Sequence, residues 1–139
     1  MSSACTHASW PARDLGAAVQ ALVRATGLTD SLLFNLLLGR TWPPEAADVR
    51  LAASVCELLG LSPLVQRMLQ GLQQTVGDGG WALSHGERSR VFLARALLQR
   101  DVALVILDES FAALDPETLR QVGAGVLAAA PTLLVISHD

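Results

Sequence analysis

The chain divides into a longer stretch with helical spacing and a shorter stretch with the pattern of buried strands. Within residues 28–100, apolar side chains recur every three or four positions, which predicts helices. One helix is expected over the leucines that begin at Leu32, and it ends before Gly39. A second starts at Pro44, has Gly60 just after its last turn, and should bury one stripe. The residues of that stripe are Ala47, Leu51, Val55, Leu58 and Leu59.

Two further helices are predicted after Gly60. Ser62 and Pro63 suit the N-cap and first position of a short helix that ends near Gln70. A glycine-rich connection follows, and the next helix should run over residues 86–99. Its apolar side is expected to hold Leu93, Ala94, Leu97 and Leu98, and its polar side Arg88, Arg95 and Gln99.

The pattern changes after Asp101. The continuous aliphatic run Val102–Leu107 is typical of a strand buried on both faces, as in parallel sheets. Asp115 and Pro116 then predict the N-cap and first position of a helix, and residues 132–136 form a second buried-type strand. The apolar side of this helix should hold Leu119, Val122, Val126 and Leu127. A strand, a crossover helix and a parallel strand are therefore expected.

The composition excludes several classes of protein. The 139 residues are 51% hydrophobic with a formal net charge of -3, so a soluble globular protein is expected and nucleic-acid binding is not. No apolar run approaches the roughly 20 residues of a membrane-spanning helix. The cysteines Cys5 and Cys56 lack metal-site or disulfide spacing relative to each other and to the three histidines, which favours a reducing cytosolic setting.

One absence is especially informative. All 10 residues counted as lysine or arginine are arginine, so the sequence contains no lysine. A phosphate-binding P-loop of the GxxxxGK[ST] type needs a lysine to reach the β- and γ-phosphates. This sequence therefore contains no such loop.

Four short sequences, in a fixed order, carry the candidate chemistry. They are Leu83-Ser84-His85-Gly86-Glu87, the run from Leu104 to Asp108-Glu109, Ala112-Ala113-Leu114-Asp115, and Ser137-His138. Ser84 and Gly86 fall at a helix start, where backbone N–H groups and the helix dipole attract anions. Alternatively, Ser84 is only an N-cap and Glu87 its capping-box partner. Asp108 and Glu109 end a strand where α/β folds bind ligands, or else they merely solvate the strand end.

Together, these four sequences resemble the second half of the nucleotide-binding domain of an ATP-binding cassette (ABC) transporter, exporter type. They match its LSGGQ signature, Walker B strand, D-loop and switch histidine, although His85 and Glu87 replace a glycine and the glutamine. The resemblance implies an α/β fold in which a P-loop NTPase (RecA-like) core joins an all-helical subdomain. This fragment would be mostly helical with a short parallel β unit. Residues 1–27 form a poorly specified lead-in, 28–100 the helical subdomain, and 101–139 part of the core.

The resemblance also implies a role for each candidate residue. Glu109 would be the general base, His138 would contact the γ-phosphate, and Asp108 would hold Mg²⁺ through water. The residues expected to contact the ATP of the opposite subunit are Ser84, Gly86, Glu87 and Asp115. The implied partners are a second ABC cassette and the transmembrane domains of a transporter, with the chain peripheral on the cytoplasmic side of the inner or plasma membrane.

The expected function is therefore coupling of ATP binding and hydrolysis to export. Two alternatives stay open: a non-catalytic module that completes the ATP site of another cassette, and a fragment of a soluble ABC ATPase of DNA repair or translation. The sequence shows neither the heptads nor the repeat usual in that last class. Because the P-loop is missing, we expect a truncated reading frame or, less simply, a split cassette completed by another polypeptide.

We predict that the isolated chain hydrolyses no ATP, because a cassette without its phosphate-binding lysine cannot hold the nucleotide for in-line attack. The measurement is phosphate release by the purified chain in the presence of Mg²⁺. A Mg²⁺-dependent turnover that Glu109→Gln abolishes would contradict this prediction.

Overall fold

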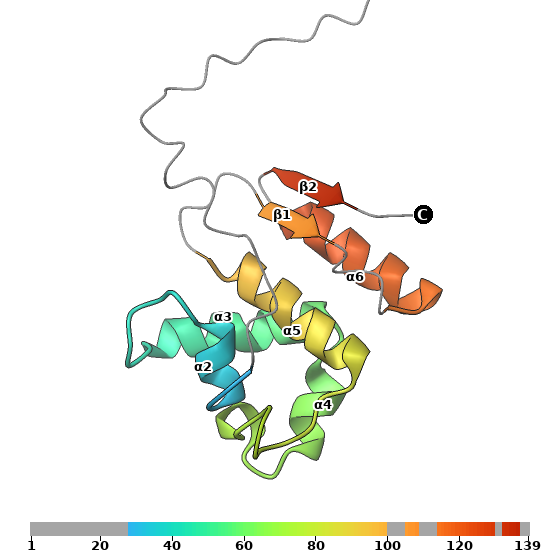
Figure 1. The fold of residues 1–139 in the computed structure, drawn as a ribbon. Coiled ribbons are helices and arrows are strands. Elements are labelled where there is room, and N and C mark those ends of the chain that lie inside the picture. Colours follow the sequence, from blue (N-terminus) through green and yellow to red (C-terminus); the bar gives the residue numbers. More distant parts are fainter. Residues whose placement is uncertain (1–27, 100–104, 109–113, 130–131, 137–139) are drawn as a thin grey trace, which may run out of the picture.

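The computed structural model describes residues 28–99, 105–108, 114–129 and 132–136. A helical unit is followed by a strand, helix and strand (Figure 1). The elements in chain order are α2 Leu32–Leu36, α3 Ala46–Leu58, α4 Ser62–Arg67, the 3-10 turn η1 Gly71–Gln73, α5 His85–Leu97, β1 Val105–Asp108, α6 Pro116–Ala129 and β2 Leu133–Ile136. Within these ranges, no helix has both the length and the apolar character needed to cross a membrane.

The predicted helices are present, but several boundaries and several buried positions differ. Helix α3 has Glu45 as its N-cap, so Pro44 precedes the helix instead of starting it. Gly60 follows the C-cap with a φ of 66°, which confirms its expected role. Helix α4 ends at Arg67, short of the predicted Gln70, and its N-cap is Leu61.

The stripe predicted for α3 is only partly right, because Val55 and Leu59 are buried but Ala47, Leu51 and Leu58 are not. Leu51 and Leu58 are 44% and 40% exposed, and the buried side of the helix includes Asp48. The buried positions near the core are Asp48, Ala52, Val55, Cys56 and Leu59. The reason is an ion pair between the Asp48 carboxylate and the Arg40 guanidinium, whose Nε also donates to the Leu98 carbonyl at 2.6 Å. Hydrophobic spacing alone cannot reveal a carboxylate that is buried because its partner is buried with it.

Arg95 is likewise not on an exposed polar side of α5, because it is only 7% exposed. Its Nε donates to the Asn35 carbonyl at 2.7 Å and its Nη2 to Asn35 Oδ1 at 3.2 Å. The Asn35 amide in turn donates to the carbonyls of Thr29 and Ser31, at 2.5 and 2.8 Å. Burial lowers the pKa of Arg95 from its ordinary value, but an arginine remains charged in proteins.

The strand, helix and strand after α5 form the expected parallel unit. Strand β1 pairs with β2 in parallel, with Val105 opposite Leu133 and Asp108 opposite Ile136. Val122 and Val126 of α6 are buried as predicted, whereas Leu119 and Leu127 are 39% and 69% exposed. These two leucines do not belong to the core.

A glycine in α6 brings this helix close to α3. A Cβ atom added at Gly125 would lie 2.9 Å from Cγ of Leu58, closer than van der Waals contact allows. The missing side chain therefore lets the two helices approach. Helix α5 also contacts both β1 and α6, so it connects the helical unit with the parallel unit.

We predict that Asn35→Ala lowers the free energy of unfolding by about 2–4 kcal/mol, because it removes an acceptor from a buried charged group. Asn35→Asp keeps that acceptor but sets an oxygen against the Thr29 and Ser31 carbonyls, so it should also destabilise the chain. Urea denaturation of the full chain measures both changes. Gln70→Ala, at an exposed amide, is the control, and an equal loss in Asn35→Ala and Gln70→Ala would contradict the role assigned to Asn35.

Candidate functional site

The N-terminal end of α5 is built as a complete capping box. Ser84 is the N-cap, and its Oγ accepts from the Glu87 backbone N–H at 3.2 Å. In the opposite direction, Oε2 of the Glu87 carboxylate accepts a hydrogen bond from the Ser84 backbone N–H at 2.9 Å. The capping alternative left open by the sequence is thus confirmed as local structure. Because the Ser84 side chain is exposed and a hydroxyl can donate as well as accept, the same geometry still offers a donor to a ligand.

A cation from another helix completes this end of α5. Arg67, in the last turn of α4, forms an ion pair with Glu87 through Nη2 and Oε1. Burial alone would raise the pKa of Glu87. Hydrogen bonds from the Ser84 backbone and Arg67 outweigh burial and leave that pKa below its ordinary value. The carboxylate is therefore charged at neutral pH, and sequence reasoning missed its partner because Arg67 lies 20 positions away.

A second arginine holds the start of α5 against the turn between α3 and α4. Arg90 donates through Nε to the Gly86 carbonyl at 3.2 Å and through Nη1 to the Gly60 carbonyl at 2.8 Å. The backbone that carries Ser84 and Gly86 is consequently fixed from two neighbouring elements.

The predicted metal and catalytic residues belong to the other unit. Asp108 is the last residue of β1 and pairs in register with Ile136, the last residue of β2. The carboxyl ends of both strands therefore lie at one edge of the sheet, where α/β proteins place their ligands. Glu109 directly follows Asp108 in sequence and His138 follows shortly after β2, but both lie outside the described residues.

Asp115 caps α6 as the sequence predicts. Its carboxylate accepts from the backbone N–H of Glu117 at 3.1 Å, from that of Thr118 at 3.0 Å, and from the Thr118 hydroxyl at 2.6 Å. The hydroxyl contact, followed by the backbone contact of Thr118, lowers the pKa of Asp115. The carboxylate is charged and exposed, so it can contact another molecule while it caps the helix.

The structure does not gather all the candidate residues into one site. The two ends of α5 are roughly 20 Å apart, for 13 residues at about 1.5 Å each. Its C-terminal end lies on the side of the strands and its N-terminal end beside α4 (Figure 1). Ser84, Gly86 and Glu87 are brought together, while Asp108 belongs to a separate edge.

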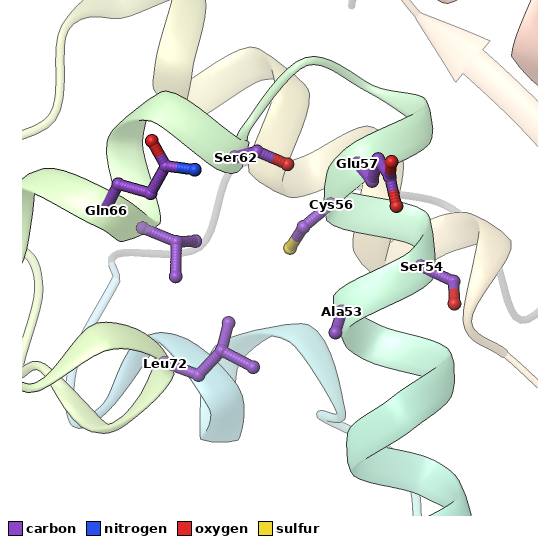
Figure 2. A pocket seen from close by; sticks show the side chains of 8 residues that line it. Ala53, Ser54, Cys56, Glu57, Ser62, Gln66 and Leu72 are labelled. Carbon is purple, nitrogen blue, oxygen red and sulfur yellow. The ribbon is translucent and has the colours of Figure 1, made fainter.

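A pocket of about 310 Å³ lies between α3, α4 and η1, away from these residues. Figure 2 shows that the sulfur of Cys56 faces its interior. The lining residues are Ala53, Ser54, Cys56, Glu57, Ser62, Val65, Gln66 and Leu72. Burial raises the pKa of Cys56 to about 12, so its thiol stays protonated and is a poor nucleophile. Among the described residues, no group of three histidine, cysteine, aspartate or glutamate side chains could hold a metal ion.

Known proteins similar to this chain are exporters. No protein-family model matches it. An ATP-dependent lipid A-core flippase of Alkalilimnicola ehrlichii is 35% identical over 111 residues, which cover 78% of this chain and 18% of the flippase. The corresponding flippase of Vibrio cholerae is 46% identical over 76 residues, covering 53% of this chain and 13% of the flippase. The chain thus spans less than a fifth of the length of these relatives.

A solved structure shows the same likeness. A bacterial Atm1-family ABC exporter with ATP bound superimposes with a TM-score of 0.67 at 26% sequence identity. The match covers 84% of this chain and 20% of the exporter chain. The homologues of this chain are therefore ABC exporters, and the similarity is confined to a limited segment of each.

We predict that Glu87→Gln destabilises the chain at pH 7 by at most about 1 kcal/mol, because glutamine keeps the capping box but loses the charge that pairs with Arg67. The folded-state pKa of Glu87 is lowered, so its charge stabilises the fold above the ordinary value of 4.5 and this contribution is lost as the pH falls through the folded-state pKa. Urea denaturation should separate variant and parent at pH 7, and the difference should shrink as the pH falls below 4.5. Glu57→Gln, on the exposed side of α3, is the control, and a pH-independent difference for Glu87→Gln would contradict the charge argument.

Proposed function

We propose that the chain is part of an ATP-binding cassette of an exporter, in which ATP binding and hydrolysis drive transport across a membrane. Residues 28–100 would form the helical subdomain and residues 101–139 part of the RecA-like core. The observation that carries the proposal is the end of α5, where a fixed helix start presents an exposed serine hydroxyl. The names of the similar exporters support it, and they favour an exporter over a soluble ATPase of DNA repair or translation.

The residues present fit a nucleotide and Mg²⁺. The helix start at Ser84 and Gly86 offers backbone N–H groups, a hydroxyl and a favourable dipole to a phosphate, which is the usual chemistry of phosphate sites on helices. Asp108 ends a strand at the ligand-binding edge, where its carboxylate suits Mg²⁺ held through water. ATP, when bound, supplies the phosphoryl group whose transfer to water releases the energy for transport.

The roles proposed for this chain follow from that arrangement. Ser84 and Gly86 bind phosphate oxygens of an ATP held by a second cassette, and Asp115 contacts that cassette across the interface. Glu109 takes the proton of the attacking water, and His138 donates a hydrogen bond to the γ-phosphate. A phosphate cradle with its lysine must come from outside this sequence. That it lies on a longer form of the same polypeptide, or on another polypeptide, stays a prediction.

The remaining partners follow from the exporter assignment. The transmembrane domains of the exporter would dock on the cassette, so the chain would lie on the cytoplasmic side of the membrane as a peripheral part. The substrate is selected by those transmembrane domains, and the relatives include lipid A-core flippases. The separation of Ser84 from Asp108 supports a second ABC cassette as a partner.

The test exploits a difference between capping and phosphate binding. Aspartate is as good an N-cap as serine, but its negative charge repels phosphate. We would replace the matching segment of the Alkalilimnicola ehrlichii flippase by residues 28–139 and measure ATP hydrolysis. Ser84→Asp should lower kcat/KM by about 100-fold or more, the scale expected when a donor to a transferring phosphate is lost.

The melting temperature of the Ser84→Asp chimaera should stay close to that of the parent chimaera, because the cap is retained. Ser54→Asp, on the exposed side of α3, is the matched control and should leave kcat/KM within about twofold. If Ser84→Asp hydrolyses ATP as fast as the parent chimaera, Ser84 is only a cap and the proposed function loses its main support.

A further inference from the structure

The signature end of α5 contains a negative charge where the proposed function needs to attract one. The carboxylate of Glu87 occupies the N3 position, and the structure places it in the same capping box as Ser84. A charged carboxylate next to a phosphate-binding helix start opposes the dipole that draws the phosphate in. A sequence with glutamine at this position would not have this problem, so the charge of Glu87 must be compensated.

The structure supplies one compensating group. The guanidinium of Arg67 pairs with Oε1 of Glu87, while Oε2 accepts from the Ser84 backbone N–H. Both oxygens of the carboxylate are therefore engaged, one by the helix start and one by a cation. The side chain of Glu87 is 14% exposed and that of Arg67 is 58% exposed, so solvent screens the pair mainly from the side of the arginine.

The position of Arg67 fits this role. It lies in the last turn of α4, where the negative end of the helix dipole favours a cation, and its Nε reaches the Pro63 carbonyl at 3.4 Å. The nearby Arg90 has carbonyl oxygens of Gly60 and Gly86 as its recorded partners, so it does not neutralise Glu87 directly. Arg88 is exposed on α5. Within the described ranges, Arg67 is thus the residue that forms an ion pair with Glu87.

We propose that Arg67 is a positioning residue of the signature site: by neutralising and holding Glu87, it keeps the helix start at Ser84 able to accept a phosphate. This inference rests on the proposed function and adds a residue outside the four sequences that carry it. The effects of changing residues 67 and 87 should therefore be coupled. Loss of Arg67 should matter only while residue 87 is charged.

The experiment is a double-mutant cycle on the full chain. The binding partner is the intact cassette of the Vibrio cholerae flippase, loaded with ATP and blocked in hydrolysis by a glutamine in place of its general base. The variants are Arg67→Met, Glu87→Gln and the double variant, and the measured quantity is the ATP-dependent Kd at low salt. We expect Arg67→Met to raise the Kd about tenfold while residue 87 is glutamate. The double variant should return to within about twofold of Glu87→Gln.

Rescue of Arg67→Met by Glu87→Gln distinguishes the positioning role of Arg67 from direct phosphate binding and from a purely structural role. If Arg67 bound the phosphate directly, Glu87→Gln would not rescue Arg67→Met, and the inference would be overturned. If Arg67 were only structural, the affinity would follow the melting temperature of each variant instead of the charge at position 87, which would also overturn it. Arg50→Met, at an exposed arginine of α3, changes the net charge equally and should leave the Kd unchanged.

The result also separates this inference from the proposed function. A parent chain that associates with the ATP-loaded cassette but is insensitive to Arg67→Met leaves the function intact and removes only the role of Arg67. A parent chain that shows no ATP-dependent association removes both.

Discussion

The buried contact between Asn35 and Arg95 is the interaction on which the helical unit depends. Helix α2 has only five residues, so most of its last carbonyls have no partner within the helix. Arg95 of α5 donates to one of them, at Asn35, and Gln99 donates to the carbonyl of Leu38 at 2.8 Å. The exchange runs both ways, because Arg40 donates to the carbonyl of Leu98 at the end of α5. Side chains at each of these two helix ends thus donate hydrogen bonds to backbone carbonyls of the other. These contacts fix the position of α5.

The position of α5 in turn governs the candidate chemistry. Helix α5 contacts β1 and α6, while its N-terminal end carries Ser84 beside α4 (Figure 1). The helix keeps its own N-terminal end and the carboxyl edge of the strands at a set separation. Such a separation makes sense if each end serves a different nucleotide, as in a dimer whose sites are shared between subunits. The proposed function therefore depends on how α5 packs, and not only on the residues around Ser84.

The capping box illustrates how one set of atoms can serve two purposes. Ser84 and Glu87 satisfy the free N–H groups of α5, which any helix of this kind requires. The same arrangement fixes the hydroxyl of Ser84 in place and leaves its side chain exposed. Glutamate at position 87 strengthens the cap through its charge but introduces repulsion toward a phosphate. We propose that Arg67 neutralises this charge, so that the cap is kept and the repulsion of the phosphate is reduced.

The sequence by itself determined the order of helices and strands, the parallel pairing of β1 and β2, and the caps at Ser84 and Asp115. Each of these depends on neighbours in sequence or on hydrophobic runs, so a local pattern is sufficient to predict it. The structure alone decided which face of α3 is buried and that Arg95 and Asp48 lie inside. It also decided that Arg67 meets Glu87. These outcomes depend on charged partners brought together from distant positions, and the energy of burying a charge is set by a partner that spacing along the chain cannot identify.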